Sequence, residues 1–346
     1  MVSTAAALPT RATPPPSYDH LASLTDERGL FEHARGAVPR REHGYCVDDV
    51  ARGLLIAVSE PDQTPQLAAL TETYLRFVEA AIQPTGTMHN RMDVHGTWTD
   101  APDLGDWWGR ALWALGRAAT SAPLAFTRKR ALRAFLRLAE QRSPHRRAMT
   151  FAALGAGQLL LSGNQDSRIR DLLLDGLAVI PGRAASGWDW PEERLRYGNA
   201  ALAEAVIVGG AALRDQDMLA RGLRLLDTLL ALETRDGHLS VAGVEGRGPA
   251  DTEPQFDQQP IEIVAIADAA ARAFDLTGDS HWRDVVRRAW AWFLGENDSH
   301  TGMVDENTGA GFDGLERTGR NDNRGAESTL AALGTYQQAR RLGVCE

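Results

Sequence analysis

The sequence predicts an all-helical fold, an (α/α)6 toroid built from six helical hairpins. Apolar residues return every three or four positions along most of the 346 residues, which is the spacing of packed helices. Helices with a charged face alternate with helices rich in Ala, Gly and Leu, and the second kind is expected to be buried on nearly all sides. Long connections lead from the charged kind to the apolar kind, so they gather at one end of the molecule.

The apolar helices form the expected inner ring. Their predicted ranges are 48–59, 106–120, 147–162, 199–214, 260–276 and 324–340. The charged helices form the expected outer ring, with predicted ranges 64–83, 124–141, 165–179, 216–233 and 279–294. The stretch 19–34 supplies a sixth outer helix, which we expect to be short or broken because it contains Gly29. A right-handed superhelical array is the main structural alternative, and six pairs favour the closed ring.

Four long loops precede inner helices and are the expected location of function. They cover residues 84–105, 180–198, 234–259 and 295–323, and loops of this length in compact domains are usually functional. Small β-hairpins are expected in these loops, for instance where residues 86–91 and 95–99 flank a turn-like 93–95. We expect residues 17–346 to form one domain and residues 1–16, which end in three prolines, to be a disordered leader.

Composition narrows the function classes. The net charge is −9, and the basic residues form no concentrated stripe, which argues against a nucleic-acid partner. No apolar run approaches the roughly 20 residues that span a bilayer, and the N-terminus does not resemble a signal peptide. Two cysteines, Cys46 and Cys345, make neither a disulfide framework nor a metal-ligand set. A cytoplasmic protein is therefore expected; the sequence does not give the oligomeric state.

Five acidic residues at or near the starts of inner helices are the candidate catalytic groups: Asp48, Asp49, Asp106, Glu262 and Glu327. Cleavage of a glycosidic bond needs two carboxyl groups, one to protonate the leaving oxygen and one to activate water or attack the sugar. Helix capping is the competing interpretation. Asp106 stands where an N-cap residue would stand, and Glu262 lies three residues after Gln259, as in a capping box. One of the adjacent pair Asp48 and Asp49 could cap its helix while the other faces the lumen.

Polar and aromatic residues of the same segments are the candidate substrate-binding groups. Aromatic rings can stack on a pyranose, while amides, acids, His and Arg pair with its hydroxyls. The set is His43, Tyr45, Trp107, Arg110, Trp188, Asp189, Trp190, Tyr197, Asn199, Asp257, Gln258, Gln259, Asp313, Asn321 and Asn323. N-capping is the alternative role for Asn199, and one tryptophan of each neighbouring pair is expected in the core. His89 and His95 lack helical spacing and further ligands, so we assign no metal and no cofactor.

Four segments, at residues 43–52, 106–116, 256–262 and 323–330, resemble the six-hairpin glycosidase-like (α/α)6 toroid proteins. In particular they resemble bacterial members associated with glycosyltransferases and mannoside-processing enzymes. The segments span most of the chain. The resemblance implies the toroid fold and a carbohydrate-related role.

Two weaker resemblances concern the pair Asp48–Asp49. Toroidal α-mannanases use an adjacent aspartate pair, which would make one aspartate the nucleophile and the other the acid/base. Toroidal terpene cyclases use an Asp-x-Asp-Asp motif, but Cys46 stands at the first position here. The richness in amides and acids also argues against a hydrocarbon substrate.

The sequence therefore predicts a carbohydrate-active enzyme, a glycoside hydrolase acting on an oligosaccharide, with mannose-containing chains among the expected substrates. A glycan-binding or pathway-scaffolding protein of the same fold is the second hypothesis, and it needs no acid of raised pKa. A sugar epimerase or isomerase is the third, with His43 as the candidate base. Fold alone does not separate these three.

Overall fold

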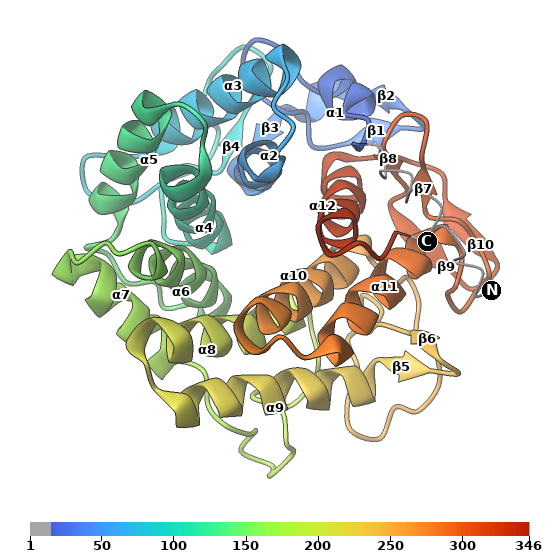
Figure 1. The fold of residues 1–346 in the computed structure, drawn as a ribbon. Coiled ribbons are helices and arrows are strands. Elements are labelled where there is room, and N and C mark those ends of the chain that lie inside the picture. The colour runs from blue at the N-terminus through green and yellow to red at the C-terminus, as the bar shows by residue number, and fades with distance from the viewer. Residues whose placement is uncertain (1–14, 346) are drawn as a thin grey trace, which may run out of the picture.

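The computed structural model describes residues 15–345, and its helices form two concentric rings (Figure 1). Each inner helix packs against the next, and the last packs against the first, so the ring is closed. The predicted toroid is confirmed, and the open superhelical array is wrong. The inner helices are α2 (Val47–Ser59), α4 (Asp106–Ser121), α6 (Arg146–Leu161), α8 (Asn199–Leu213), α10 (Pro260–Thr277) and α12 (Ala326–Leu342).

The outer helices pack against the outside of the inner ring, and several contact two inner helices. The outer helices are α1 (Asp19–Ser23), α3 (Pro65–Ala81), α5 (Ala125–Leu138), α7 (Ser167–Ala178), α9 (Gln216–Leu232) and α11 (Ser280–Leu294). α1 has one turn and packs on α12, as the sequence led us to expect of the stretch 19–34. The predicted helix boundaries differ from the observed ones by three residues or fewer, apart from this first outer element.

Small residues allow the inner helices to approach closely. A Cβ atom on Gly109 of α4 would lie 2.1 Å from the carbonyl oxygen of Ala148 in α6. One on Gly155 of α6 would lie 2.3 Å from the carbonyl oxygen of Leu112 in α4. Backbone-to-backbone contact of this kind leaves no room for a larger side chain. The Ala- and Gly-rich composition of the inner helices therefore follows from their packing.

The strands of the described chain form five two-stranded antiparallel pairs near the inner-helix starts. The pairs are β1 (Ala34–Arg35) with β2 (Val38–Pro39), β3 (Tyr45–Cys46) with β4 (Arg91–Met92), β5 (Thr234–Arg235) with β6 (His238–Leu239), β7 (Val304–Asp305) with β8 (Ala310–Gly311), and β9 (Gly314–Glu316) with β10 (Gly319–Asn321). The hairpin predicted around residue 94 is present, since Met92 bridges Trp98.

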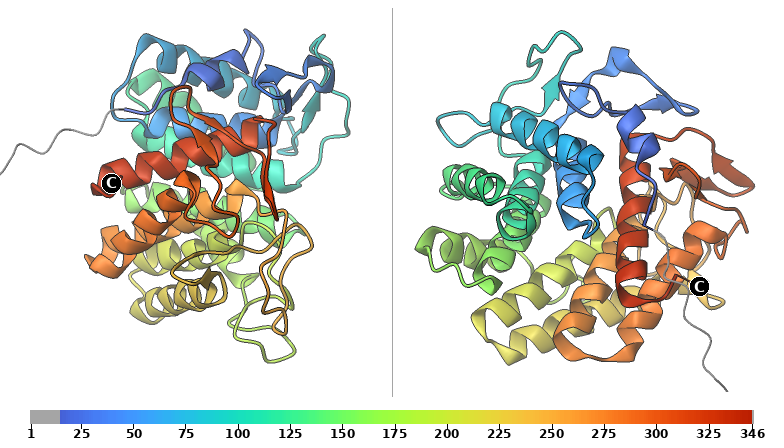
Figure 2. Two further views of the ribbon diagram at one scale, coloured as in Figure 1. Left: turned by 90° about the vertical axis from the view of Figure 1, so that its right-hand side faces the viewer. Right: turned by 45° about the horizontal axis from the view of Figure 1, so that its top comes forward.

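The side view in Figure 2 shows the long loops and hairpins extending from one end of the ring, opposite the end where α12 finishes. The inner helices therefore begin beneath these loops, as predicted. Within residues 15–345, no helix is both long and apolar enough to cross a membrane. The disordered leader remains a prediction, because residues 1–14 of it lie outside the described residues.

Candidate functional site

A cavity of about 330 Å³, which we call the front cavity, lies where α2, α10 and α12 begin. Its wall is dominated by ionisable side chains from distant parts of the sequence. Three of the five predicted catalytic acids line it, together with two arginines and further polar groups. The acids and arginines of this wall are Glu32, Asp48, Asp49, Asp313, Glu327, Arg52 and Arg110.

Arg52 joins two of the predicted catalytic acids. Its Nη1 lies 2.6 Å from Asp49 Oδ1, and its Nη2 lies 2.8 Å from Glu327 Oε2. The side chain of Asp49 is 5% exposed, whereas that of Glu327 is 40% exposed. One guanidinium therefore holds a buried carboxyl and an accessible carboxylate beside each other at the cavity wall.

Asp48 is anchored by two partners of its own. Arg110 Nη1 lies 2.6 Å from Asp48 Oδ1, and Asn90 Nδ2 donates to Oδ2 over 3.2 Å. Burial alone would raise the pKa of Asp48, but Arg110 and Arg52 outweigh it and keep that pKa below its usual range. Arg110 also lies over the Phe151 ring, with its Cζ 4.6 Å from the ring centroid. Asp48 is thus a fixed, ionised carboxylate at neutral pH.

Asp49 behaves in the opposite way. Burial raises its pKa to about 7 in spite of Arg52, and the nearby charges of Glu327, Glu32 and Asp48 add to the rise. The neighbouring aspartates of one helix turn therefore have pKa values on opposite sides of the normal range. Acid/base pairs in enzymes are separated by environment in this way.

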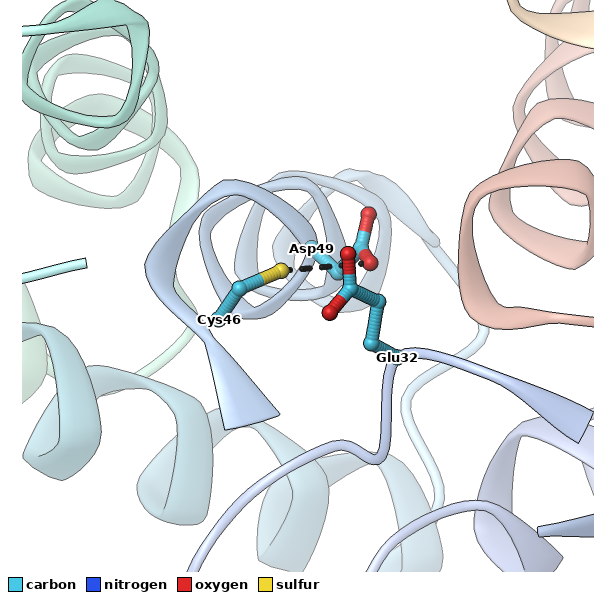
Figure 3. Close-up of side chains that lie close together, drawn as sticks. All are labelled: Glu32, Cys46 and Asp49. Carbon is cyan, nitrogen blue, oxygen red and sulfur yellow. Dashed lines mark hydrogen bonds between the residues drawn. The ribbon is translucent and has the colours of Figure 1, made fainter. Parts of the chain in front are cut away.

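Glu32, Cys46 and Asp49 form a cluster beside the cavity, and Figure 3 shows the three side chains converging from the chain before β1, from β3 and from α2. Their possible ligand atoms lie within 4.8 Å of one another. The Cys46 thiol donates to Asp49 Oδ2 over 3.3 Å, and burial raises the pKa of this thiol. Both carboxylates already pair with guanidinium groups, of Arg91 and Arg52. A protonated thiol and neutralised acids suit a metal ion poorly.

A second hollow, the side recess, adjoins the front cavity. Its volume is about 420 Å³, and Gln259 lines both. Tyr197, which is 42% exposed, stands in its wall with Arg196 and Val244. The two hollows therefore form an extended depression rather than a single pit.

Glu262 lines the side recess and caps a neighbouring helix. Its carboxylate accepts from the backbone N–H groups of Gly198 at 2.5 Å and Asn199 at 3.2 Å, at the start of α8. Asn199 Nδ2 also donates to it over 3.0 Å. The capping box within its own helix is therefore wrong, because Glu262 satisfies the N-terminus of α8 instead. Asn199 is likewise not the N-cap, which is Gly198.

Asp106 makes no capping bond, and Gly105 is the N-cap of α4. The hydroxyl of Tyr197, in the loop before α8, donates to Asp106 instead. Trp107 donates from Nε1 to the Met88 carbonyl over 2.9 Å. These contacts place Asp106 and Trp107 beside the loops but outside the wall of the front cavity.

Three predicted sugar-binding residues are buried in the protein. Tyr45 stacks on Phe31 and donates to Asp26, and Trp190 is 0% exposed. Gln258 donates to Asp298 over 2.6 Å and is also fully buried. None of the three lines the front cavity or the side recess, because each is enclosed where the loops pack against the ring.

The other predicted binding residues divide among the walls of the hollows, contacts that hold backbone, and the surface. Asp313 accepts from the backbone of Gly325 at 2.7 Å and so holds the start of α12, while Asn323 accepts from Gly36. Gln259 lines both hollows. The remaining members lie on the surface or are half-buried, away from both hollows: His43, Trp188, Asp189, Asp257 and Asn321.

The sequence did not single out four residues that shape the front cavity. Arg52 could have been found, because it follows Asp49 by three positions on one helix face. Asn90 accepts from the backbone of Val47 and so caps α2 from a distant loop. Glu32 and His33 line the cavity from the chain just before β1. No local signal connects these three to the site.

No protein-family model and no curated protein matches the sequence. Among solved structures, the chain is similar to a sugar epimerase from a ruminal bacterium, with a TM-score of 0.70, 13% identity and coverage of 94% of this chain and 95% of that one. A D-mannose isomerase has a TM-score of 0.65 and 11% identity, with coverage of 92% of this chain and 94% of that one. The cellulase Cel9M of C. cellulolyticium has a TM-score of 0.64 and 9% identity, with coverage of 91% of this chain and 88% of that one.

These similarities extend over nearly the whole length of each chain at very low identity, so they concern the fold. The closed double ring, the small antiparallel strand pairs and these neighbours agree with the architecture predicted from the sequence. The chain has the (α/α)6 toroid fold.

Proposed function

We propose that this protein is a glycoside hydrolase that cleaves an oligosaccharide by paired-carboxylate catalysis in the front cavity. The observation that carries the proposal is the pair Asp49 and Glu327, joined through Arg52. One carboxyl is buried with a pKa of about 7, and the other is accessible to a ligand. Hydrolysis of a glycosidic bond needs these two kinds of carboxyl group.

Each acid has a distinct role in this proposal. Asp49 retains its proton near neutral pH and donates it to the leaving oxygen. Glu327 is the most exposed of the three cavity acids discussed, and it activates water or attacks the sugar. Asp48, whose oxygens are occupied by Arg110 and Asn90, supplies a fixed negative charge that favours a developing oxocarbenium ion.

The shape of the depression favours an oligosaccharide over a single sugar. The front cavity and side recess, which meet at Gln259, measure about 330 and 420 Å³. The exposed ring of Tyr197 and the side chain of Arg196 line the recess, where a further sugar unit would lie. The solved structures of similar fold include a cellulase, a sugar epimerase and a D-mannose isomerase, so carbohydrates agree with the fold as well. Manno-oligosaccharides remain the first substrates to test.

A sugar epimerase or isomerase is the second candidate function, and two imidazoles favour it. His33 lines the front cavity, and its ring centroid lies 5.1 Å from that of His43. An imidazole at the mouth could remove a proton next to a sugar carbonyl. His43 itself is not part of the cavity wall, so His33 is the better base for this alternative.

The deciding experiment is incubation of the purified protein with manno- and gluco-oligosaccharides, followed by mass spectrometry and NMR of the products. A hydrolase gives shorter chains, and an epimerase or isomerase gives products of unchanged mass with new anomeric or C2 signals. Saturable binding with an unchanged sugar would support the binding-module hypothesis. Cleavage should fall by roughly two orders of magnitude or more in Asp49→Asn and Glu327→Gln.

A matched control is Asp236→Asn, which removes an 82% exposed carboxylate in the β5–β6 turn. This variant should cleave like the wild type. The proposed site is wrong if Asp49→Asn and Glu327→Gln both keep full activity on a proven substrate.

A further inference from the structure

A third hollow, the rear chamber, lies at the opposite end of the ring, where the inner helices finish. It measures about 200 Å³. Polar side chains of all six inner helices face it, among them Ser59, Arg117, Gln158, Glu204, Asp268 and Gln338. Trp113 adds an indole ring to the wall. The proposed hydrolase chemistry uses none of these residues.

An apolar neck separates the rear chamber from the front cavity. The hollow between them measures about 50 Å³ and is lined by Leu55, Phe151, Ile261, Val264 and Leu330 among others. Arg52 and Arg110 mark its front end, since both also line the front cavity. A sugar cannot pass a constriction of this size and polarity without displacing side chains. The rear chamber is therefore entered from its own end of the ring.

Glu204 points into the rear chamber without a hydrogen-bond partner. Its side chain is 5% exposed, and its nearest charged neighbour is Arg272, with Nε 3.9 Å from Oε1. Burial, with Asp268 nearby, raises the pKa of Glu204 to about 8. No group among residues 15–345 donates to or accepts from its carboxyl group. A buried polar group left unpaired costs about 1–3 kcal/mol, which is a reason to look for a ligand.

Arg117 likewise has few polar partners. Its Nε donates to Ser59 over 3.0 Å, and no carboxylate of the described chain lies within ion-pair distance of it. Burial, together with the nearby charges of Arg272 and Arg341, lowers its pKa. The Nε of Arg272 also lacks a hydrogen-bond partner, although its Nη2 donates to Gln158 over 2.9 Å. Donors and an acceptor thus converge on the same small volume.

The charges of the chamber nearly balance. Arg117, Arg272 and Arg341 face Asp268, Asp275 and Glu204, and the raised pKa of Glu204 leaves this group largely protonated, so that it can both donate and accept. The C-terminal ends of the inner helices add partial negative charge, which makes an anion an unfavourable occupant, and the three arginines oppose a cation. Neutral hydroxyl groups, which both donate and accept, suit such a mixed wall. The volume lies below the roughly 300–1,000 Å³ of sites for drug-sized ligands.

We propose that the rear chamber is a second binding site, for a neutral polyhydroxylated ligand the size of one sugar ring. Glu204 and Arg117 hold its hydroxyl groups, and the Trp113 ring covers its apolar face. This site is independent of the proposed hydrolysis, because its residues and its entrance differ from those of the front cavity.

The test is a calorimetric titration of the full-length protein with D-mannose, D-glucose and myo-inositol. At least one of these should bind saturably to the wild type. Glu204→Gln keeps the side-chain volume, and Arg117→Met keeps the stem; each should weaken binding tenfold or more. Glu204→Gln replaces a largely protonated carboxyl by a neutral amide, and Arg117→Met removes a buried charge that has no ion-pair partner in the described chain, so neither should lower the melting temperature. Glu327→Gln is the control and should bind as the wild type does, whether or not the protein hydrolyses any glycoside.

Two results would overturn the proposal. One is the absence of saturable binding of all three ligands to well-folded wild type. The other is binding that both rear-chamber variants retain, including the case in which Glu327→Gln abolishes it, because the sugar then occupies the front cavity. If one of the two variants does not fold, the other still tests the proposal.

Discussion

Glu327 of α12 pairs with Arg52 of α2 across the junction where the last inner helix meets the first. The ion pair, with 2.8 Å between Arg52 Nη2 and Glu327 Oε2, joins residues from opposite ends of the sequence. The same arginine holds Asp49. The charge arrangement of the front cavity therefore depends on the correct closure of the ring.

Replacing Arg52 by Gln should raise the pKa of Asp49 further above 7, because Arg52 is the main group that lowers it. The loss of stability should be greater at pH 8 than at pH 5. At pH 8 the ionised Asp49 of the wild type is stabilised by Arg52, whereas at pH 5 Asp49 is protonated in both proteins. Breaking a buried ion pair costs about 3–5 kcal/mol, and we expect the lower part of that range at pH 8. Urea denaturation at the two pH values measures this. Arg168→Gln, which breaks an exposed pair, is the control, and equal losses for both variants would contradict the prediction.

The pH dependence of catalysis should report Asp49. As the proton donor it must be protonated, so the rate should fall as the pH rises through about 7. Glu32 contributes to the raised pKa of Asp49 by its negative charge. Glu32→Gln should therefore move the alkaline limb of the pH–rate profile to lower pH, while Asp236→Asn should leave it in place. An unmoved limb in Glu32→Gln would assign the titration to another group.

Glu233 should make the protein less stable as the pH rises. It is fully buried, and burial raises its pKa from 4.5 to about 8, with Glu262 adding to the rise. Between these values the folded state holds a proton that the unfolded state releases. The contribution of Glu233 to the free energy of unfolding is therefore fully present below pH 4.5. It decreases between pH 4.5 and pH 8, by about 1.4 kcal/mol per pH unit at most. Glu233→Gln should remove this decrease, so that it is more stable than the wild type at pH 8 and similar at pH 4.5. Chemical denaturation across this range checks the slope, and parallel curves for the two proteins would refute it.

Gly109→Ala should be strongly destabilising, since the new methyl group would meet the Ala148 carbonyl oxygen at 2.1 Å. The backbones of α4 and α6 would have to separate, and overpacking of this kind costs typically 1–3 kcal/mol. Gly182→Ala is the matched control, because nothing lies within 4 Å of its Cβ position. Thermal melts of the two variants should differ by several degrees, and equal melting temperatures would show that the two helices can adjust.

Much of the fold could be predicted because the helices follow periodicity and composition. The inner helices were recognisable from Ala, Gly and Leu on all sides, and their starts from acids such as Asp106 and from Pro260. The hairpins other than the one near residue 94 could not be located. Strands of two or three residues such as β7 and β8 are too short to show an alternating pattern.

The candidate site could be predicted less completely. Local spacing placed Asp48, Asp49 and Glu327 near helix starts, and all three line the front cavity. It could not reveal that Glu262 caps α8 or that Tyr45 lies in the core. Those positions depend on how distant loops pack, and one sequence carries no local record of such contacts.

The closure of the ring by α12 on α2 also sets the order in which the protein becomes competent during synthesis. The N-terminal helices are synthesised first. Arg52 and Asp49 are therefore present long before Glu327 is added to the chain. A chain that ends before α12 lacks Glu327 and therefore the second carboxylate of the proposed pair. Catalytic competence on the proposed mechanism therefore appears in one step, with release of the final helix.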